Sequence, residues 1–299
     1  MAKESYMIVG GSVLTDFRSS RMTRIIEGLP TGFKALDDKL MGLKNGEVIV
    51  VASRPLVGKT TFAMNIAECL SLGCDIHGVP FSGRCAGRRP VLYFSLQMPS
   101  ASFAKRLLYS RARVDSLWLE RCEMPREAPK ITALGEASNE LQQALFYVED
   151  TPGPDIEELC KKAKDMKHDH GIELVIVDYL QLCESNAMAQ HGRQAELAHI
   201  SAQLKVMAKE LMVPVIVLAQ LLKPVGRDAL PNLSDLRDAA AIEETADVVM
   251  LLHRTPPYFG SATETNQKDF ALLNISKNRN GETGEVRMPF SREFLRFDN

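Results

Sequence analysis

Six short apolar runs, rich in β-branched residues, recur along this 299-residue chain with helical stretches between them. They span Glu47–Ala52, Val91–Ser95, Leu145–Glu149, Glu173–Asp178, Pro214–Ala219 and Asp247–Leu252. Strands that are apolar on both faces and alternate with amphipathic helices form mainly parallel sheets covered on both sides. The sequence therefore predicts an α/β fold built on a mainly parallel, twisted sheet with helices on both faces.

The covering helices are also indicated by their patterns. The clearest are Thr60–Ser71, Ser100–Ser110, Asp155–His170 and Gln194–Leu211. In the last of these, apolar residues recur every three or four positions from Leu197 onward, which is typical of core or subunit packing. After Leu252 the pattern changes, because Phe270–Ser276 and Glu285–Pro289 flank a polar, glycine-containing turn. This arrangement predicts a C-terminal β-hairpin.

Composition excludes several classes of protein. The chain has 36 Lys and Arg against 38 Asp and Glu, a formal net charge of −2. Any site for a polyanion must therefore be local, or be formed by an oligomer that gathers basic residues on one surface. No apolar run approaches the ~18–20 residues that span a membrane. The start of the chain, Met1–Ser12, lacks the features of a secretory signal, so we expect a cytoplasmic protein.

The six cysteines include no Cys-x-x-Cys pair, and we expect reduced thiols. Cys74, His77 and Cys85 lie in one glycine-rich stretch and could supply three zinc ligands. A closed structural zinc site needs four ligands at tighter spacing. We therefore favour a loop in which these side chains occur together incidentally.

A phosphate-binding motif follows the first strand. A strand, a loop and a helix meet here, and the loop ends in the Gly-Lys-Thr of a P-loop. Its amides and the helix N-terminus would face phosphates, Lys59 would reach the β and γ oxygens, and Thr60 would offer its hydroxyl to Mg²⁺. The strict pattern has glycine where this chain has Ser53. The expected ATP-binding residues are Ser53, Arg54, Pro55, Val57, Gly58, Lys59, Thr60 and Thr61.

Polar side chains end two further strands. Asp178 ends the run Glu173–Asp178, and Gln220 follows Pro214–Ala219. Ligands bind at the carboxyl edge of a parallel sheet, so Asp178 is a candidate Mg²⁺ ligand together with Thr60. The alternative for Asp178 is a helix cap. Gln220 could sense the γ-phosphate or cap a turn, and we favour sensing.

Five stretches carry a more specific signal, in a fixed order. They lie at residues 54–65, 94–100, 178–182, 234–237 and 277–281. Together they resemble the RecA-like motor domain of replicative DnaB-type hexameric helicases, over Gly28 to Asn299. That family tolerates the missing first glycine of the P-loop. Met1 to Glu27 would then be an arm or linker helix, whose apolar residues could dock on a neighbouring subunit.

The resemblance implies a RecA-like P-loop NTPase fold and a homo-hexameric ring. ATP and Mg²⁺ would lie between neighbouring subunits, and single-stranded DNA would run through the central channel, with 5′ to 3′ translocation in replication and possible contacts to other replication proteins. Asp178 would be the Walker B carboxylate and Gln220 the γ-phosphate sensor. Lys277 and Arg279, on the hairpin, would act as a finger in the neighbour's site. The alternative for these two residues is a solvated basic turn.

Two departures from the family pattern bear on activity. Gln97 stands where the family has the glutamate that polarises the attacking water, and general-base assistance contributes typically ~10²–10⁴-fold. Ala240 stands where the family has glycine, in a loop that meets the DNA backbone. Arg237 and Asp238 lie beside it as candidate DNA-binding residues, with contacts directed to phosphates. Arg237 could instead pair with Asp235 or Asp238.

The stretch Gly73–Pro90 is longer than the family's usual connection and carries Arg84, Arg88 and Arg89. It could bind a partner or DNA, but we favour a solvated insertion. For the whole chain, the leading hypothesis is an ATP-dependent DNA helicase motor. The rival is a ring or clamp that binds ATP and single-stranded DNA, hydrolyses poorly, and acts as a loader or regulator. A recombinase or clock-type ATPase on the same core is a weaker third.

Overall fold

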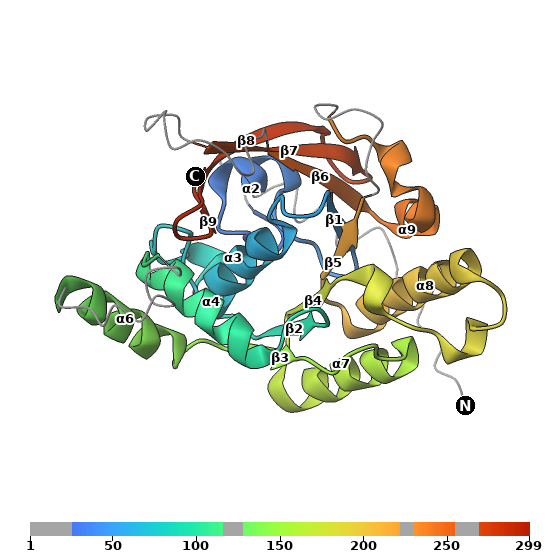
Figure 1. The fold of residues 1–299 in the computed structure, drawn as a ribbon, viewed down its shortest axis with the longest axis horizontal. Coiled ribbons are helices and arrows are strands. Elements are labelled where there is room, and N and C mark those ends of the chain that lie inside the picture. Colours follow the sequence, from blue (N-terminus) through green and yellow to red (C-terminus); the bar gives the residue numbers. More distant parts are fainter. Residues whose placement is uncertain (1–25, 116–127, 222–229, 255–268) are drawn as a thin grey trace, which may run out of the picture.

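The computed structural model describes residues 26–115, 128–221, 230–254 and 269–299. Within these residues, one nine-stranded sheet has the order β3-β2-β4-β5-β1-β6-β7-β8-β9. The strands are β1 Val48–Ser53, β2 Val91–Ser95, β3 Phe146–Glu149, β4 Leu174–Asp178, β5 Val215–Gln220, β6 Val248–Arg254, β7 Asp269–Asn278, β8 Gly284–Ser291 and β9 Arg296–Phe297. The strands from β3 to β6 in this order are parallel, and β7, β8 and β9 are antiparallel (Figure 1).

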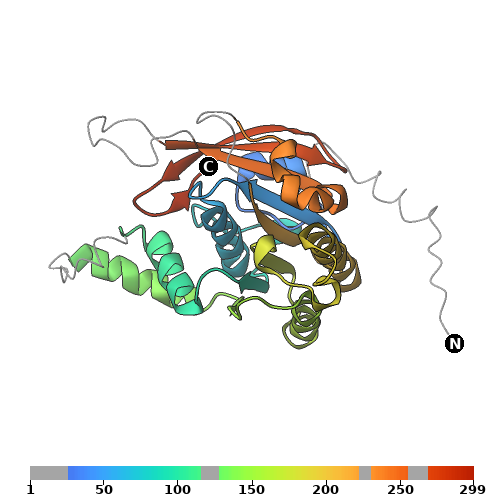
Figure 2. The same cartoon turned by 45° about the vertical axis from the view of Figure 1, so that its right-hand side comes forward.

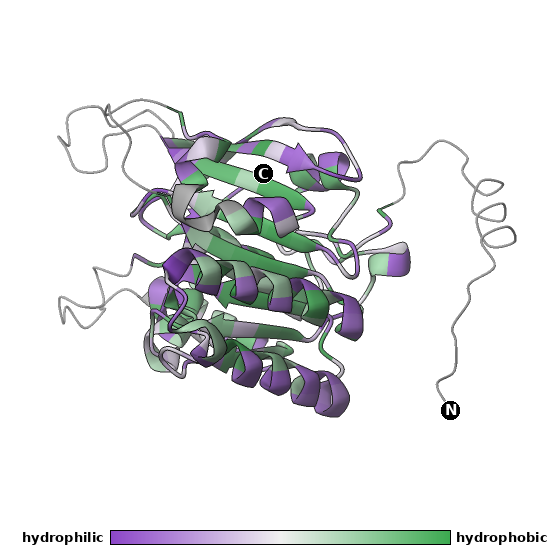
Figure 3. Ribbon diagram, turned by 90° about the vertical axis from the view of Figure 1, so that its right-hand side faces the viewer, coloured by the Kyte–Doolittle hydropathy of each residue, from purple (hydrophilic) through white to green (hydrophobic). Residues whose placement is uncertain are grey.

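Helices cover both faces of the sheet. They are α2 Lys34–Leu40, α3 Lys59–Leu72, α4 Ser100–Ala112, α6 Ala128–Leu141, α7 Ile156–His170, α8 Arg193–Leu211 and α9 Ala240–Thr245. The strand residues alternate between two cores. Val51 belongs to the core formed with α2, α3 and α4, and its neighbour Val50 to the core formed with α7, α8 and α9. This alternation is why the parallel strands are apolar throughout their length, as the colouring of Figure 3 shows.

The C-terminal hairpin extends the sheet at one end. β7 pairs with β6 from Val248 to Arg254, and β8 pairs with β7. Buried and less buried residues alternate along both hairpin strands, as expected where one face is packed and the other partly exposed. Figure 2 shows these strands, in red, at the far end of the molecule from α7.

The fold class predicted from the sequence is confirmed, and all six predicted parallel strands are present within one or two residues of their expected bounds. The four predicted helices and the hairpin are also present. The helices α2, α6 and α9 and the short strand β9 were not predicted. Among the described residues, no helix is both long and apolar enough to cross a membrane.

The carboxyl ends of four adjacent strands meet at one edge of the sheet. Ser53 at the end of β1 is in register with Gln220 at the end of β5. Ser95 at the end of β2 is in register with Asp178 at the end of β4. Residues that are widely separated in the sequence are thereby collected at one edge, the position where open parallel sheets bind ligands.

Candidate nucleotide-binding site

The loop between β1 and α3 has the backbone that a phosphate cradle needs. Gly58 precedes α3 with φ of 112°, and a Cβ there would lie 3.3 Å from the ring of Phe297, so glycine is required. No described side chain caps α3, which leaves its first amide groups open to an anion. Leu56, at the loop apex, has φ of 65° and is 72% exposed.

Lys59 and Thr60 begin α3 and lie beside Asp178. The Nζ atom of Lys59 lies 4.5 Å from the centroid of the Tyr179 ring. Burial lowers the pKa of Lys59 and raises the pKa of Asp178, and the attraction between the two groups opposes both shifts. The Thr60 side chain is hydrogen-bonded to Asp178, which also holds the pKa of this carboxyl down. The structure thus brings together the predicted phosphate and Mg²⁺ residues.

The donor set at Asp178 fits a hard cation. Its Oδ2 accepts a hydrogen bond from the Tyr93 hydroxyl at 2.9 Å, whereas Oδ1 is buried and has no hydrogen-bond partner among the described residues. An orphaned carboxylate oxygen next to a threonine hydroxyl is suited to Mg²⁺, which prefers oxygen ligands and keeps several waters.

No group of three or more His, Cys, Asp or Glu side chains that could hold a metal occurs in the described part of the chain. A magnesium ion here would therefore take its other ligands from nucleotide and water. The same finding means that Cys74, His77 and Cys85 form no metal cluster within that part.

Gln220 is held at this edge through its main chain. The Gln181 side chain donates from Nε2 to the Gln220 carbonyl oxygen at 3.1 Å, and its Oε1 accepts from the Gln220 amide at 3.2 Å. The Gln220 side chain is left exposed. Sequence reasoning missed Gln181, although it lies in one of the stretches that carry the family resemblance.

Gln97 follows β2 at the same edge and is exposed. Just before it, the Leu96 amide donates to the Asp178 carbonyl oxygen at 2.9 Å, and Ser95 Oγ donates to the Met98 carbonyl oxygen at 2.6 Å. These bonds fix the turn on which Gln97 lies. Gln97 is therefore at the same edge as Asp178, on the adjacent strand.

Lys277 and Arg279 lie at the opposite edge of the sheet. Arg279 donates its amide to the Asp247 carbonyl oxygen, just before β6 begins. On β6, the residue in register with Ser53 is Leu252, five residues further, or roughly 17 Å along a parallel strand. The two cations therefore cannot serve the P-loop of their own chain, and the structure does not bring them into one site with Lys59.

The predicted DNA-binding residues occupy a short helical segment. Arg237 and Asp238 lie in a 3₁₀ helix at Leu233–Ala239, and Ala240 begins α9. Their side chains lie outside the described residues, so their contacts stay a prediction.

The Gly73–Pro90 insertion is packed against the domain. Arg88 donates to Gln143 through both terminal nitrogens, at 3.0 and 2.8 Å, and Arg89 pairs with Glu173 at 3.3 Å. Two of its three arginines are thus engaged within the chain. The predicted arm lies largely outside the described residues, which begin at residue 26.

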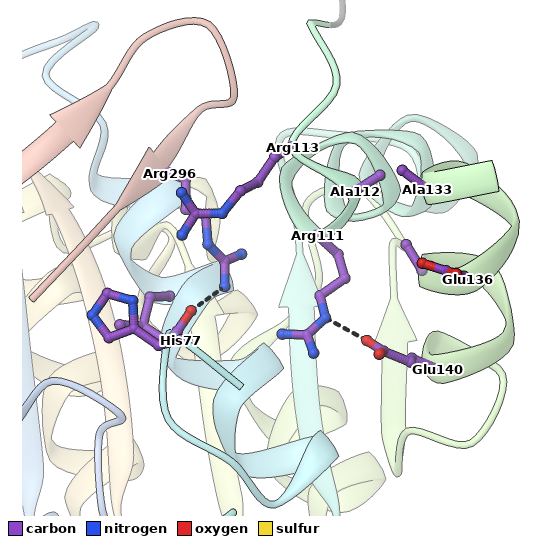
Figure 4. Close-up of a pocket in the computed structure, with 10 residues that line it drawn as sticks. His77, Arg111, Ala112, Arg113, Ala133, Glu136, Glu140 and Arg296 are labelled. Atoms are coloured by element: carbon purple, nitrogen blue, oxygen red, sulfur yellow. Dashed lines mark hydrogen bonds and ion pairs between the residues drawn. The ribbon is translucent and has the colours of Figure 1, made fainter. Parts of the chain in front are cut away.

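A separate hollow of about 240 Å³ lies between α4, α6 and β9 (Figure 4). Its charged lining includes Arg111, Arg113, Arg296 and Glu140. Arg111 pairs with Glu140, and Arg113 with Asp298. The charges of this hollow are balanced internally, and its role is structural.

Fold and edge together define a RecA-like P-loop NTPase domain. Residues 28–299 match the family described as DnaB-like helicase C terminal domain. The chain belongs to this family.

Named relatives and solved structures agree with this assignment. The chain is 35% identical over 278 residues to the replicative DNA helicase DnaC of Bacillus subtilis, covering 92% of this chain and 57% of the relative. It is 38% identical over 280 residues to the replicative DNA helicase DnaB of Pasteurella multocida, covering 92% and 56%. The chain thus spans a little over half the length of these relatives.

Two solved structures share the fold. One is an isolated ATPase domain, which superposes with a TM-score of 0.82 at 29% identity, covering 96% of this chain and 95% of that one. The other is a DnaB-like replicative helicase, studied with its interactions with primase, which superposes with a TM-score of 0.83 at 28% identity, covering 98% and 68%.

Proposed function

We propose that this chain is the motor domain of a DnaB-type DNA helicase, with residues 28–299 as the RecA-like domain. Six copies would form a ring in the cytoplasm that binds ATP and Mg²⁺ between subunits and moves 5′ to 3′ along single-stranded DNA in replication, in contact with other replication proteins. One observation carries this proposal. The phosphate cradle and the basic pair Lys277 and Arg279 lie at opposite edges of one sheet. A complete site therefore needs two copies of the chain.

In this site, the loop from Ser53 to Thr61 surrounds the phosphates, and Lys59 neutralises the β and γ oxygens. Thr60 and Asp178 hold Mg²⁺, which neutralises charge on the phosphates and orients them. Gln220 meets the γ-phosphate through its exposed amide. Its main chain is held by Gln181, which supports a sensing role over a turn cap.

Lys277 and Arg279 then act on the neighbouring subunit's nucleotide. A cation that enters from across an interface stabilises the charge of the transition state only when the ring is assembled. Hydrolysis is thereby coupled to the arrangement of two subunits. DNA contacts from Arg237, Asp238 and Ala240, directed to the phosphate backbone, would make the binding independent of sequence.

Gln97 favours the second candidate function. A glutamine amide can orient the attacking water but cannot accept its proton, so hydrolysis is slowed while binding stays intact. A ring of this kind would clamp single-stranded DNA in an ATP-bound state and act as a loader or regulator of an active helicase.

Steady-state ATP hydrolysis, with and without single-stranded DNA, separates the two candidates. The natural protein is compared with Gln97→Glu and with the inactive control Lys59→Ala, and the oligomeric state of each sample is measured by light scattering. DNA-stimulated turnover well above the Lys59→Ala control supports the motor. Nucleotide binding without turnover, restored by Gln97→Glu, supports the clamp. A natural protein that binds no nucleotide contradicts both.

A further inference from the structure

Tyr93 lies directly behind the carboxylate assigned to Mg²⁺. It belongs to β2, is completely buried, and donates its hydroxyl hydrogen to Asp178 Oδ2 at 2.9 Å. The strands that carry the two residues are adjacent, with Tyr93 in register with Ile176, two positions before Asp178. This bond crosses from one strand to the next and is not part of the P-loop or of the family motif at Asp178.

The phenol is held in one place by its neighbours. The Tyr93 ring lies 4.7 Å from the ring of Phe103 and stacks on Phe146 with centroids 6.2 Å apart. Burial, with Asp178 adjacent, raises the pKa of Tyr93 well above its usual value, so the hydroxyl remains a donor. A fixed donor of this kind determines how the carboxylate is turned.

The two oxygens of Asp178 are therefore inequivalent. Oδ2 is occupied by Tyr93, and Oδ1 has no hydrogen-bond partner among the described residues. Without the phenol, Oδ2 would face the aromatic rings of Phe103 and Phe146 with no donor. The carboxylate would then gain by rotating toward the ammonium group of Lys59, and Oδ1 would lose its fixed orientation.

We propose that Tyr93 is a positioning residue that sets the affinity of the nucleotide site for Mg²⁺. It holds Oδ2 of Asp178 so that Oδ1 is presented to the ion or to one of its waters. Partners of this type orient metal ligands from behind, and their removal typically costs 10–100-fold in metal affinity. The inference depends on the proposed nucleotide site but not on whether the protein turns ATP over.

The substitution Tyr93→Phe tests this proposal, because it removes the hydroxyl and keeps the ring packing. The readout is the fluorescence of N-methylanthraniloyl-ATP bound to the full chain, first in EDTA and then during a Mg²⁺ titration. We expect the Mg²⁺ midpoint to rise roughly 10-fold or more. Affinity for the nucleotide in EDTA should stay within about twofold, because the amides of the cradle are untouched.

Tyr147→Phe is the matched control. Tyr147 lies on β3, the strand next to β2, and its ring stacks on His170 on the other side of the sheet from Tyr93. Its substitution should leave the Mg²⁺ midpoint unchanged. Thermal unfolding of both variants reports any general loss of stability.

A double-mutant cycle with Asp178→Asn gives the decisive comparison. If Tyr93 acts through Asp178, adding Tyr93→Phe to Asp178→Asn changes the Mg²⁺ midpoint no further. The proposal is overturned if Tyr93→Phe has the natural midpoint, or if its effect is the same with and without Asp178→Asn. A natural protein that binds the nucleotide with no dependence on Mg²⁺ contradicts the proposed site itself, which is a different outcome from either.

Discussion

Arg279 donates a hydrogen bond from Nη2 to the main-chain carbonyl oxygen of Glu244, 2.6 Å away. Lys277 also bonds carbonyl oxygens of this helix end, at Glu243 and Glu244. Burial and then the neighbouring Arg279 lower the pKa of Lys277, and the surrounding acidic residues oppose that shift. Both cations are therefore bound at the C-terminal end of α9, the helix whose first residue is Ala240 in the predicted DNA-binding segment.

This placement leads to a prediction for mixed rings. In a Gln97→Glu background, Arg279→Ala should lower ATP turnover by about 10³-fold or more, because a trans-acting arginine is worth 10³–10⁵ in rate. Nucleotide binding should be retained, since the cradle lies at the other edge of the sheet. Mixing Arg279→Ala with Lys59→Ala subunits should restore part of the turnover, because some interfaces then combine an intact cradle with an intact Arg279.

The measurement is ATP hydrolysis of each variant alone and of mixtures at several ratios. Arg287→Ala, on the neighbouring strand β8, is the control for loss of an arginine from the hairpin. Mixtures with no more activity than either variant alone would mean that Arg279 does not act across an interface.

Gln97→Glu should raise the rate of ATP hydrolysis by ~10²–10⁴-fold, because a carboxylate at this position can accept the proton of the attacking water. The side chain is exposed, so the substitution should leave nucleotide affinity and stability nearly unchanged. The added base should also give the rate an acid limb, with turnover falling as pH drops toward ~4.3, the ordinary pKa of glutamate.

Initial rates between pH 4.5 and 8, compared with Gln97→Ala, check this prediction. Gln97→Ala should be no faster than the natural protein at any pH. Equal rates for Gln97→Glu and the natural protein would show that another group supplies the base.

The strands that form the site were predictable, whereas the pairing between their ends was not. Apolar runs such as Leu174–Asp178 are buried on both faces and have a local signal. The hydrogen bond from Tyr93 to Asp178 joins residues 85 positions apart and depends on β2 lying next to β4. Strand order is decided by how the helices pack across the sheet, so no local pattern encodes it.

The placement of Arg279 and the missed helix α6 illustrate the same limit. Arg279 was correctly assigned to a turn of the hairpin, but its distance from the P-loop follows from β6 lying beside β1. In α6, Ala137 alone is buried among the residues whose side chains are described. A helix that buries so little has a weak apolar stripe, and its contact with α4 supplies the tertiary stabilisation.

Asp37 should make the stability of the domain depend on pH. Its carboxylate is 5% exposed and accepts a hydrogen bond from the Thr31 amide at 2.8 Å. Burial raises its pKa to about 7, although the bonds from Thr31 and Gly32 oppose the shift. The folded state therefore binds a proton between the unfolded pKa of about 3.9 and pH 7 that the unfolded state does not. This contribution to stability is complete below that range and is lost as pH rises through 7.

Asp37→Asn should remove this dependence, since its amide oxygen can still accept the Thr31 bond. Between pH 5 and pH 7, the free energy of unfolding of the natural protein should fall by about 2–3 kcal/mol more than that of the variant. Urea unfolding at the two pH values measures both slopes. Parallel slopes for the two proteins would mean that Asp37 is ionised throughout this range in the folded state.

Glu68 should be among the most sensitive positions for stability. It lies on α3, fully buried, and accepts hydrogen bonds to both carboxylate oxygens from Arg296 at 3.0 Å and one from Arg111 at 3.2 Å. Arg296 is 2% exposed, and Figure 4 shows it beside Arg111 at the hollow between α4, α6 and β9. Removing the carboxylate leaves the Arg296 charge buried without its partner.

Breaking a buried ion pair by removing one partner costs roughly 3–5 kcal/mol. We therefore expect Glu68→Gln to lower the urea midpoint with an unchanged m value, because the unfolded state exposes the same surface. Glu210→Gln breaks the exposed pair with Lys164 and should leave the midpoint in place. If Glu68→Gln left the midpoint equally unaffected, water or another acidic group would have to solvate Arg296, and α3 and β9 would not depend on this pair for their packing.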